Sequence, residues 1–358
     1  MSLRHVVAIA AAALVLTGGL VVGLGAGSAS AGHTTSTTTT AATVPEPLVT
    51  TVAQPVNPAA TLPGANKPPV TVGDLNAPEE QLIIGEIYAF ALKQQGYSIR
   101  YLSRNVNGPH ARTVALKQGK LDIYPEYLGE WNSVVAHLHR RFSSVQAAFG
   151  AAKTYAKRHG FKLLLPTPFS DTSCVAVLSQ YAQANHVYSI PELVRSGPII
   201  FAAPTVFQDH ASGLPALEHG YHLNPGYLQT IVDGLQYYWL RTGNVDATSC
   251  VTTDPSLGSS RYLELKDPKH VFGHGNVIPV TTPHVISVEG PAFAHTIERV
   301  DALLTLRAIR GLNAEIELGG HSPIDIAEQF LEGNGVLPPS RYAPVPTTTP
   351  TSSTSTET

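Results

Sequence analysis

The 358-residue chain is 43% hydrophobic and 14% charged, so it is long and apolar enough to bury one large core or two medium ones. Its formal net charge is −3, and its 23 basic residues form no cluster beside the 26 acidic ones. A nucleic-acid surface needs clustered Lys and Arg, so the composition excludes a polycationic nucleic-acid binder and we expect no nucleic-acid partner.

The N-terminus has the pattern of an export signal. Arg4 and His5 precede the long apolar run 6–27, and Ser28–Ala31 supplies the small residues that signal peptidase accepts. We expect residues 1–31 to be a signal peptide, and the protein to be exported to the periplasm or the outer face of the cell membrane. An uncleaved anchor is the alternative, because the run is long enough to span a bilayer. No Cys lies near the cleavage site, which excludes lipid attachment there.

Two segments are too poor in large apolar residues to fold. Residues 32–69 are rich in Thr, Ala and Pro, and residues 342–358 have the same character. Neither segment buries enough apolar surface to offset the entropy of the chain. We therefore expect a disordered linker or stalk before the folded part, and a disordered tail after it.

The folded part begins with alternating strands and helices. We expect strands at 70–72, 98–102 and 121–124, and helices at 78–96 and 111–117. This order implies a parallel sheet with right-handed crossovers.

The stretch 121–131, LDIYPEYLGEW, is a candidate site because it follows a strand and begins a helix. Small molecules bind beyond the carboxyl ends of strands in open α/β sheets. The polar residues of this corner are Asp122, Tyr124, Glu126, Tyr127 and Glu130.

The alternation continues to residue 331. We expect helices near 134–159, 228–240, 291–311 and 324–331, and strands at 161–165, 174–178, 199–203, 245–247, 262–265 and 277–280. If the last helices return to the first sheet, the chain crosses between two lobes near Pro168 and near Pro279. The predicted fold is α/β with two lobes: 70–168 and 280–341 form the first lobe, and 169–279 forms the second.

Seven segments of the chain resemble one family, in sequence and in order. They are VTVGDLNAPEEQLIIGEIYAFALKQQGY, ALKQGKLDIYPEYLGEW, PFSDTSCVAV, SGLPALEHGY, SCVTTDPSL, LNAEIEL and IAEQFL. They are similar to the substrate-binding proteins of ABC importers for glycine betaine, choline and related osmoprotectants. The resemblance covers nearly all of 70–337 and implies a type II periplasmic-binding-protein fold, with two open, mostly parallel sheets joined by two crossover segments.

The resemblance also implies a function. It predicts a non-catalytic monomer that needs no cofactor, binds a small-molecule solute between its lobes and delivers the solute to the membrane permease of an ABC importer. Aromatic rings hold a quaternary ammonium by its charge, and Arg, Lys or backbone donors hold a carboxylate on the same ligand.

Two ligand positions of the family are kept in this chain. Tyr127 matches a tyrosine of the family's cage, and Asp171 matches the acidic residue that opens the second lobe. The alternatives are a partly exposed turn tyrosine and a capping carboxylate. Glu130 and Asn76 are further candidates, although N-terminal helix positions explain them better.

Other ligand positions of the family carry different residues here. Ser173 and Val251 stand where the family usually has tyrosines, and His210 stands where it has an arginine. The family's Phe-Pro-Pro-Tyr-Tyr segment reads Phe-Gly-His-Gly-Asn and contains His274, and the early Lys falls at Leu75 or Asn76. We infer that the fold and the transport role persist more securely than the ligand does. The expected solute is an osmoprotectant or a quaternary-ammonium-like molecule, and these replacements leave open that the ligand has diverged.

The lost rings weaken a betaine site. Each of three rings is worth about 0.5 to 2 kcal/mol, so their loss costs orders of magnitude in affinity unless Tyr124 or Trp131 replaces them. A loop histidine is usually just solvated, but binding becomes pH-sensitive if His210 and His274 line the cleft.

The only two cysteines, Cys174 and Cys250, lie beside Ser173 and Val251, which the family brings together. In an oxidising compartment they can form one disulfide, and two inert buried thiols are the alternative. A bridge would close a long loop and add about 4 kcal/mol of stability on the chain-entropy model.

The sequence gives less support to an enzymatic function. His137 and His139 would face different sides of a helix, and no matching third and fourth metal ligands are evident. The sequence has no Gly-x-Ser-x-Gly elbow and no phosphate-binding loop. We expect neither an enzyme nor a metal site. An extracellular sensor or adhesion module that keeps the fold is the main alternative, and a secreted hydrolase is the third.

Overall fold

The computed structural model describes residues 61–73, 79–102 and 108–339. The predicted signal peptide, residues 32–60 of the predicted linker, the tail and Asn76 lie outside the described residues. The prediction that the linker is disordered as far as residue 69 is wrong. The N–H of Gly64 donates to the carbonyl of Gln95 (2.9 Å), and Nζ of Lys67 donates to that of Val288 (2.6 Å), so 61–69 packs on the first lobe. None of the helices in the described ranges is both long and apolar enough to cross a membrane.

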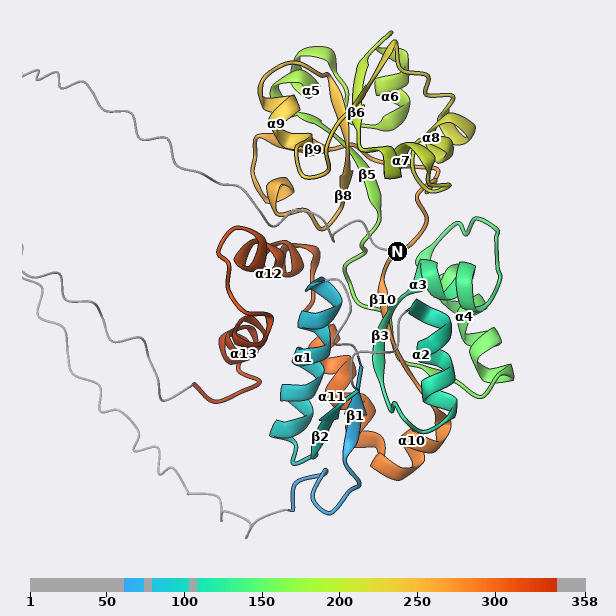
Figure 1. The fold of residues 1–358 in the computed structure, drawn as a ribbon, viewed down its shortest axis with the longest axis vertical. Coiled ribbons are helices and arrows are strands. Elements are labelled where there is room, and N and C mark those ends of the chain that lie inside the picture. The colour runs from blue at the N-terminus through green and yellow to red at the C-terminus, as the bar shows by residue number, and fades with distance from the viewer. Residues whose placement is uncertain (1–60, 74–78, 103–107, 340–358) are drawn as a thin grey trace, which may run out of the picture. The chain divides into compact units, whose positions relative to one another are not determined.

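The first lobe contains the elements at the two ends of the folded chain (Figure 1). These are β1 (Val70–Val72), α1 (Glu79–Gln94), β2 (Ile99–Tyr101), α2 (Gly108–Lys117), β3 (Tyr124–Tyr127), α3 (Leu128–Glu130), the π-helical turn η1 (Trp131–Val135), α4 (Val145–Arg158), β4 (Lys162–Leu163), β10 (Val277–Thr281), α10 (Pro283–Glu289), α11 (Pro291–Asp301), α12 (Leu306–Glu317) and α13 (Pro323–Gly333).

The second lobe contains the elements between β4 and β10. These are β5 (Ser173–Leu178), α5 (Ser179–Asn185), α6 (Ile190–Arg195), β6 (Ile200–Ala203), α7 (Thr205–Asp209), α8 (Leu214–Tyr221), β7 (Tyr227–Thr230), α9 (Gln236–Arg241), β8 (Ala247–Val251), the 3₁₀ turn η2 (Pro255–Gly258) and β9 (Tyr262–Glu264). Its strands form one sheet in the order β7-β6-β8-β5-β9.

The sheets are mixed, and not mostly parallel as predicted. β1 and β2 are parallel, and Val72 forms a parallel bridge with Ile123, as the β-α-β-α-β order predicts. β10, however, returns from the second lobe between β3 and β4 and pairs antiparallel with both. In the second lobe β6 is parallel to β7 and β8, while β5 is antiparallel to β8 and β9.

The strand predicted over 121–124 is displaced: β3 begins at Tyr124, runs through Pro125 and ends at Tyr127. Pro125 lies opposite Pro279 in the register of β3 and β10. Neither proline has an N–H group, and alternate residue pairs of an antiparallel ladder exchange no hydrogen bonds. Two prolines that face each other at such a position cost the sheet no hydrogen bond, so the strand persists.

Three predicted helices are interrupted. Ser144 starts α4 by accepting a hydrogen bond from the N–H of Ala147 (3.2 Å), so the helix predicted over 134–159 begins late. The helix predicted over 291–311 is divided in the same way, because Thr305 caps a new helix, α12. The helix predicted over 228–240 is wrong in its first half, which forms the edge strand β7.

Each lobe has its own hydrophobic core. In the first lobe, α1 buries Ile83, Ile84 and Ile87 completely. The same core contains Phe293 of α11 and Leu331 of α13. The last helices therefore pack with the first segment of the chain, and residues of 174–271 form the cores on the two faces of the second lobe's sheet.

Candidate functional site

Tyr127 is held by a buried carboxylate. At the end of β3, its hydroxyl donates a hydrogen bond to Oε1 of Glu80 (2.8 Å). Glu80 lies in the first turn of α1 and is 1% exposed. Its Oε2 accepts a hydrogen bond from Nδ2 of Asn313 (2.9 Å), which is itself buried on α12. Three elements of the first lobe thus meet at one carboxylate.

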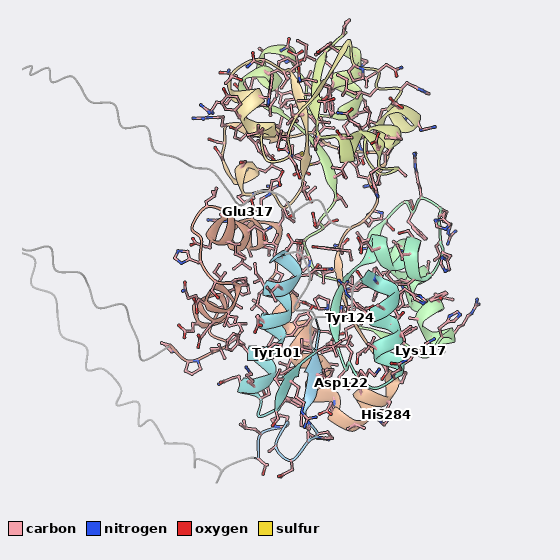
Figure 2. All side chains as sticks on the ribbon, in the orientation of Figure 1. Tyr101, Lys117, Asp122, Tyr124, His284 and Glu317 are labelled. Carbon is pink, nitrogen blue, oxygen red and sulfur yellow. A yellow bond between two sulfur atoms is a disulfide. The ribbon has the colours of Figure 1, made fainter. Side chains whose placement is uncertain are left out.

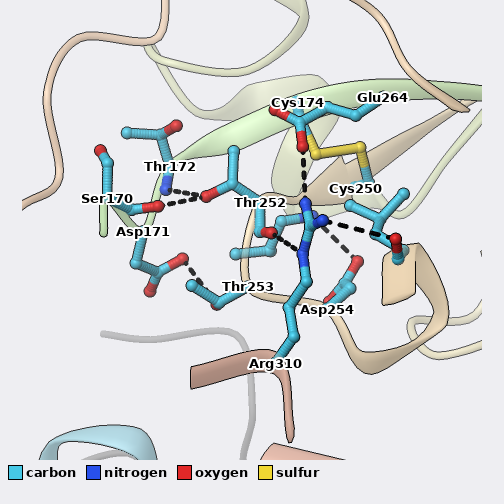
Figure 3. A network of polar contacts seen from close by, with 12 residues as sticks. Ser170, Asp171, Thr172, Cys174, Cys250, Thr252, Thr253, Asp254, Glu264 and Arg310 are labelled. Atoms are coloured by element: carbon cyan, nitrogen blue, oxygen red, sulfur yellow. Dashed lines mark hydrogen bonds and ion pairs between the residues drawn. A yellow bond between two sulfur atoms is a disulfide. The ribbon is translucent and has the colours of Figure 1, made fainter. Parts of the chain in front are cut away.

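The same asparagine reaches the second lobe. Nδ2 of Asn313 also donates to the carbonyl of Thr253 (3.2 Å), and the hydroxyl of Thr253 donates to Oδ1 of Asp171 (3.2 Å). A continuous chain of hydrogen bonds therefore runs from Tyr127 through Glu80, Asn313 and Thr253 to Asp171. Figure 3 shows its last link, between Thr253 and Asp171. The chain of hydrogen bonds connects the two residues that the sequence predicted as opposite walls of a site.

The two crossover segments meet at Asp171. Its N–H donates to the carbonyl of Gly275 (3.0 Å), and the N–H of Gly275 donates to Oγ of Ser170 (2.8 Å). The backbones approach so closely that a Cβ on Gly275 would collide with the carbonyl of Asp171. Glycine is therefore required at 275, and the crossing places Asp171 at the junction of the lobes.

Ser173 and Val251 are neighbours across two strands. They form a residue pair between β5 and β8, and the next pair along is Cys174 with Cys250. The structure joins these two cysteines in a disulfide, and both are buried. The bridge ties the two strands together directly beside the pair of predicted ligand positions.

Thr252 fixes the entry to the second lobe. Its hydroxyl donates to the carbonyl of Ser170 (2.6 Å) and accepts from the N–H of Thr172 (3.0 Å), and its own N–H donates to the carbonyl of Thr172 (2.9 Å) (Figure 3). The N–H of Val251 donates to Oδ2 of Asp254 (3.0 Å). The residues that flank Asp171 are thus held from the 251–254 turn.

The other residues of the predicted corner 121–131 serve the fold of the first lobe. Oδ2 of Asp122 accepts from the N–H of Thr71 (2.7 Å), and Glu126, fully buried, lies 3.4 Å from Nη1 of Arg112. Asp122 and Tyr124 lie among the side chains of this lobe (Figure 2). Of this corner, Tyr127 is the residue that the hydrogen-bond chain reaches.

Tyr124 and Trp131 are the rings that the sequence analysis named as replacements for the lost rings of the cage. Both side chains are completely buried in the first lobe's core, and the ring of Trp131 packs edge-on against Phe161 with centroids 5.5 Å apart. A ring without exposed surface offers no face to a solute, so this packing gives no support to the alternative that either ring takes the place of a lost one.

The structure gives the two predicted histidines other contacts. His210 is exposed, and its Nδ1 lies 2.8 Å from Oγ of Ser212 in the same loop. His274 is half-buried, with Nε2 3.1 Å from the carbonyl of Phe142 and its ring 5.2 Å from that of His270. Burial lowers the pKa of His274, which favours the uncharged form of its ring. Neither contact joins these residues to Asp171.

Glu130 is an exposed residue at the end of α3, consistent with its reading as a helix residue. The sequence analysis missed Glu80, Thr253 and Asn313 as members of the site. All three stand inside segments that resemble the family, but no local pattern marks them. Glu80 and Asn313 are 233 positions apart, so only the folded chain brings them together.

Comparison with known families identifies the chain. Residues 68–333 match the substrate-binding domain of ABC-type glycine betaine transport systems. The chain belongs to this family. As a member of it, the protein is a substrate-binding protein of an ABC importer, a class that binds solutes outside the cytoplasm and works with a membrane permease. The family is one of transport proteins and not an enzyme class.

Several characterised proteins are similar to this binding protein. It is 26% identical over 270 residues to the glycine-betaine-binding protein of Pseudomonas aeruginosa, covering 72% of this chain and 86% of that one. It is 27% identical over 290 residues to the glycine betaine-binding protein YehZ of Escherichia coli, covering 77% and 94%. A match of 24% over 262 residues to the ergothioneine transport permease/ergothioneine binding protein EgtU of Helicobacter pylori covers 72% of this chain but 46% of that protein.

Solved structures show the same architecture. Apo YehZ from E. coli matches with a TM-score of 0.65 at 26% identity, over 75% of this chain and 99% of that one. A glycine betaine/carnitine/choline ABC transporter structure matches in fold with a TM-score of 0.67 at 18% identity, over the same shares. The predicted fold class, an α/β periplasmic-binding-protein fold of type II, is confirmed, and so is the predicted family.

Proposed function

We propose that this binding protein captures a small solute between Tyr127 and Asp171 and releases it to a permease. What supports the proposal is the hydrogen-bond chain from Tyr127 to Asp171, because it ties a ring of the first lobe to a carboxylate of the second. Both residues also match ligand positions of the family. Ser173 and Val251 complete the set on the Asp171 side.

The solute, we infer, carries a positively charged head group. Glu80 and Asp171 supply two carboxylates along the chain of hydrogen bonds, whereas the guanidinium of Arg310 is already paired with Glu264. Ser173 and Val251 offer a hydroxyl and an aliphatic face where the family usually has rings. Relatives are named for glycine betaine and for ergothioneine. Glycine betaine itself should bind weakly here, because cation-π contacts worth about 0.5 to 2 kcal/mol each are missing.

The two segments that cross between the lobes can act as a hinge on which the lobes close. The chain passes between the lobes twice, at 170–171 and at 275–276, and a solute that contacts both sides would stabilise the closed form. We propose lobe boundaries at these two crossings. The boundary predicted at 279 is moved because Pro279 lies inside β10, which pairs with β3 and β4 of the first lobe. We also propose an export signal over 1–31, a stalk up to residue 60 and a tail over 342–358. We further propose that the protein works as a monomer.

Thermal-shift screening of the exported protein tests this function. The panel is glycine betaine, choline, carnitine, ectoine, polyols and amino acids. A ligand at about 100 times its dissociation constant adds about 2.7 kcal/mol to stability, so a true solute raises Tm clearly. We expect at least one charged solute to do so, and the shift to vanish in Asp171→Asn but not in the exposed control Asp325→Asn.

Two outcomes would count against the proposal. A panel without any shift, together with binding to cell-wall material, would favour the sensor or adhesion module. A strong shift with glycine betaine alone would contradict the inference that the missing rings have changed the ligand.

A further inference from the structure

Arg310 belongs to the first lobe and forms hydrogen bonds with the second. It lies on α12, which packs against α1 and α13 of the first lobe. Its Nε donates to the carbonyl of Thr252 (2.8 Å), its Nη1 lies 3.4 Å from the carbonyl of Leu257, and its Nη2 donates to Oε2 of Glu264 (2.7 Å). All three acceptors belong to the second lobe, and Figure 3 shows the guanidinium reaching Thr252 and Glu264.

Arg310 and Asn313 act from one face of the same helix. Residues three apart on a helix are neighbours, and both side chains hold the same turn: Arg310 at the carbonyl of Thr252 and Asn313 at that of Thr253. The Arg310 and Glu264 side chains are 17% and 32% exposed. This ion pair is partly shielded from water, so it is stronger than a fully exposed surface pair.

The contacts lead from Arg310 to the carboxylate of the site. Arg310 fixes the peptide of Thr252, whose hydroxyl holds the carbonyl of Ser170 and the N–H of Thr172. The next residue, Thr253, donates its hydroxyl to Asp171. One guanidinium thus sets the position of a turn that holds Asp171 and the residues on both sides of it.

We propose that Arg310 is a positioning residue for solute capture. It contacts no solute, but it holds the Thr252–Thr253 turn, and through that turn the Asp171 carboxylate, in the orientation that the solute needs. A site held in its binding geometry before the ligand arrives loses less entropy on binding, so its dissociation constant is lower. The proposal rests on the proposed function.

The test compares Arg310→Met with Arg307→Met. Methionine keeps the aliphatic length of the side chain but removes its charge and donors. Arg307 lies one turn earlier on α12 and is exposed, so its variant controls for loss of a positive charge on the same helix. Two quantities are measured: amide hydrogen exchange, and the dissociation constant of the panel solute with the largest thermal shift.

We expect Arg310→Met to speed exchange at the amides of Thr172 and Thr252 by about tenfold or more, and to raise the dissociation constant by about tenfold, since hydrogen bonds to charged groups are lost. Tm should fall somewhat, because the carboxylate of Glu264 loses its ion pair, but the strand β10 should keep its protection. Arg307→Met should change none of these quantities. A merely structural role would expose β10 as well and leave the dissociation constant unchanged.

The proposal is overturned if Arg310→Met keeps the wild-type exchange and affinity, or if exchange rises equally throughout the chain. If Arg310→Met does not fold, Glu264→Gln replaces it. That variant removes the ion pair but leaves the bond to Thr252, so it should shift exchange at Thr172 in the same direction by a smaller factor, and no shift there contradicts the proposal. If the wild-type protein binds no solute, the proposed function fails, while exchange at Thr172 still decides the role of Arg310.

Discussion

The shared carboxylate of Glu80 makes Tyr127 both a site residue and a structural one. Tyr127→Phe keeps the ring but removes the hydroxyl that donates to Glu80. Because Glu80 is 1% exposed, water does not easily replace the lost donor, and we expect unfolding to become easier by about 1 to 3 kcal/mol. Urea denaturation measures the change. Tyr227→Phe is the control, since Tyr227 is 59% exposed, and equal stability of both variants would contradict this account.

A second buried carboxyl, Asp301, lies in the first lobe's core. Oδ1 of Asp301 accepts from the hydroxyl of Tyr88 (2.7 Å), whereas Oδ2 is buried and has no hydrogen-bond partner among the described residues. Burial raises the pKa of Asp301 well above its usual value. A raised pKa in the folded state means that the group's contribution to stability is complete below the unfolded pKa and is lost as pH rises through the folded pKa.

Asp301→Asn should therefore stabilise the protein at neutral pH. The amide keeps an oxygen for Tyr88 and never ionises, so it avoids the cost of a buried charge. Each unit of pKa shift corresponds to about 1.4 kcal/mol, which sets the scale of the gain. Urea denaturation at pH 7 and pH 4 measures it, and the gain should shrink at pH 4, where the wild-type carboxyl is protonated. A difference that does not depend on pH would refute the explanation.

Single residues of the site could be predicted only where they match a ligand position of the family. Tyr127 and Asp171 stand in segments that resemble the family, and the hydrogen-bond chain includes both. Glu80 is 47 positions from Tyr127, so no window of sequence contains the pair. Arg310 was missed for the same reason, since its acceptors lie in another lobe. Whether His210, His274, Glu130 and Asn76 contact a solute stays a prediction.

Elements with a clear hydrophobic pattern were found at nearly their true bounds. β1 coincides with its predicted range, and β10 extends one residue further than predicted. The errors arise where the partner decides the outcome. Pro125 continues a strand because another proline faces it, and β7 is an edge strand whose exposed Tyr227 gives no burial pattern.

The disulfide joins two strands beside the site, and its removal tests the stability of that element. Cys174 and Cys250 are 76 residues apart, so the double variant Cys174→Ser, Cys250→Ser should be less stable by about 4 kcal/mol on the chain-entropy model. Urea denaturation measures the loss. Titration of the unfolded wild-type protein should find no free thiol, and two titratable thiols would refute the bridge.

At the scale of the whole molecule, the alternation of strands and helices and the order of the family segments were enough to predict an α/β fold with an inserted lobe. The mixed sheets were not predictable in this way. In the first lobe, the antiparallel pairs arise because the return strand β10 enters between β3 and β4. In the second lobe, they arise because β5 lies between β8 and β9 and runs opposite to both. The local sequence determines that a segment forms a strand, but the path of the chain between the lobes determines which strands pair with it.

The central claim is that a solute lies between Tyr127 and Asp171. A crystal structure of the protein with the solute that gives the largest thermal shift tests this claim most directly. The account predicts electron density for the solute in contact with the ring of Tyr127 on one side and with Asp171 and Ser173 on the other. Solute bound elsewhere, without contact to either Tyr127 or Asp171, would contradict it.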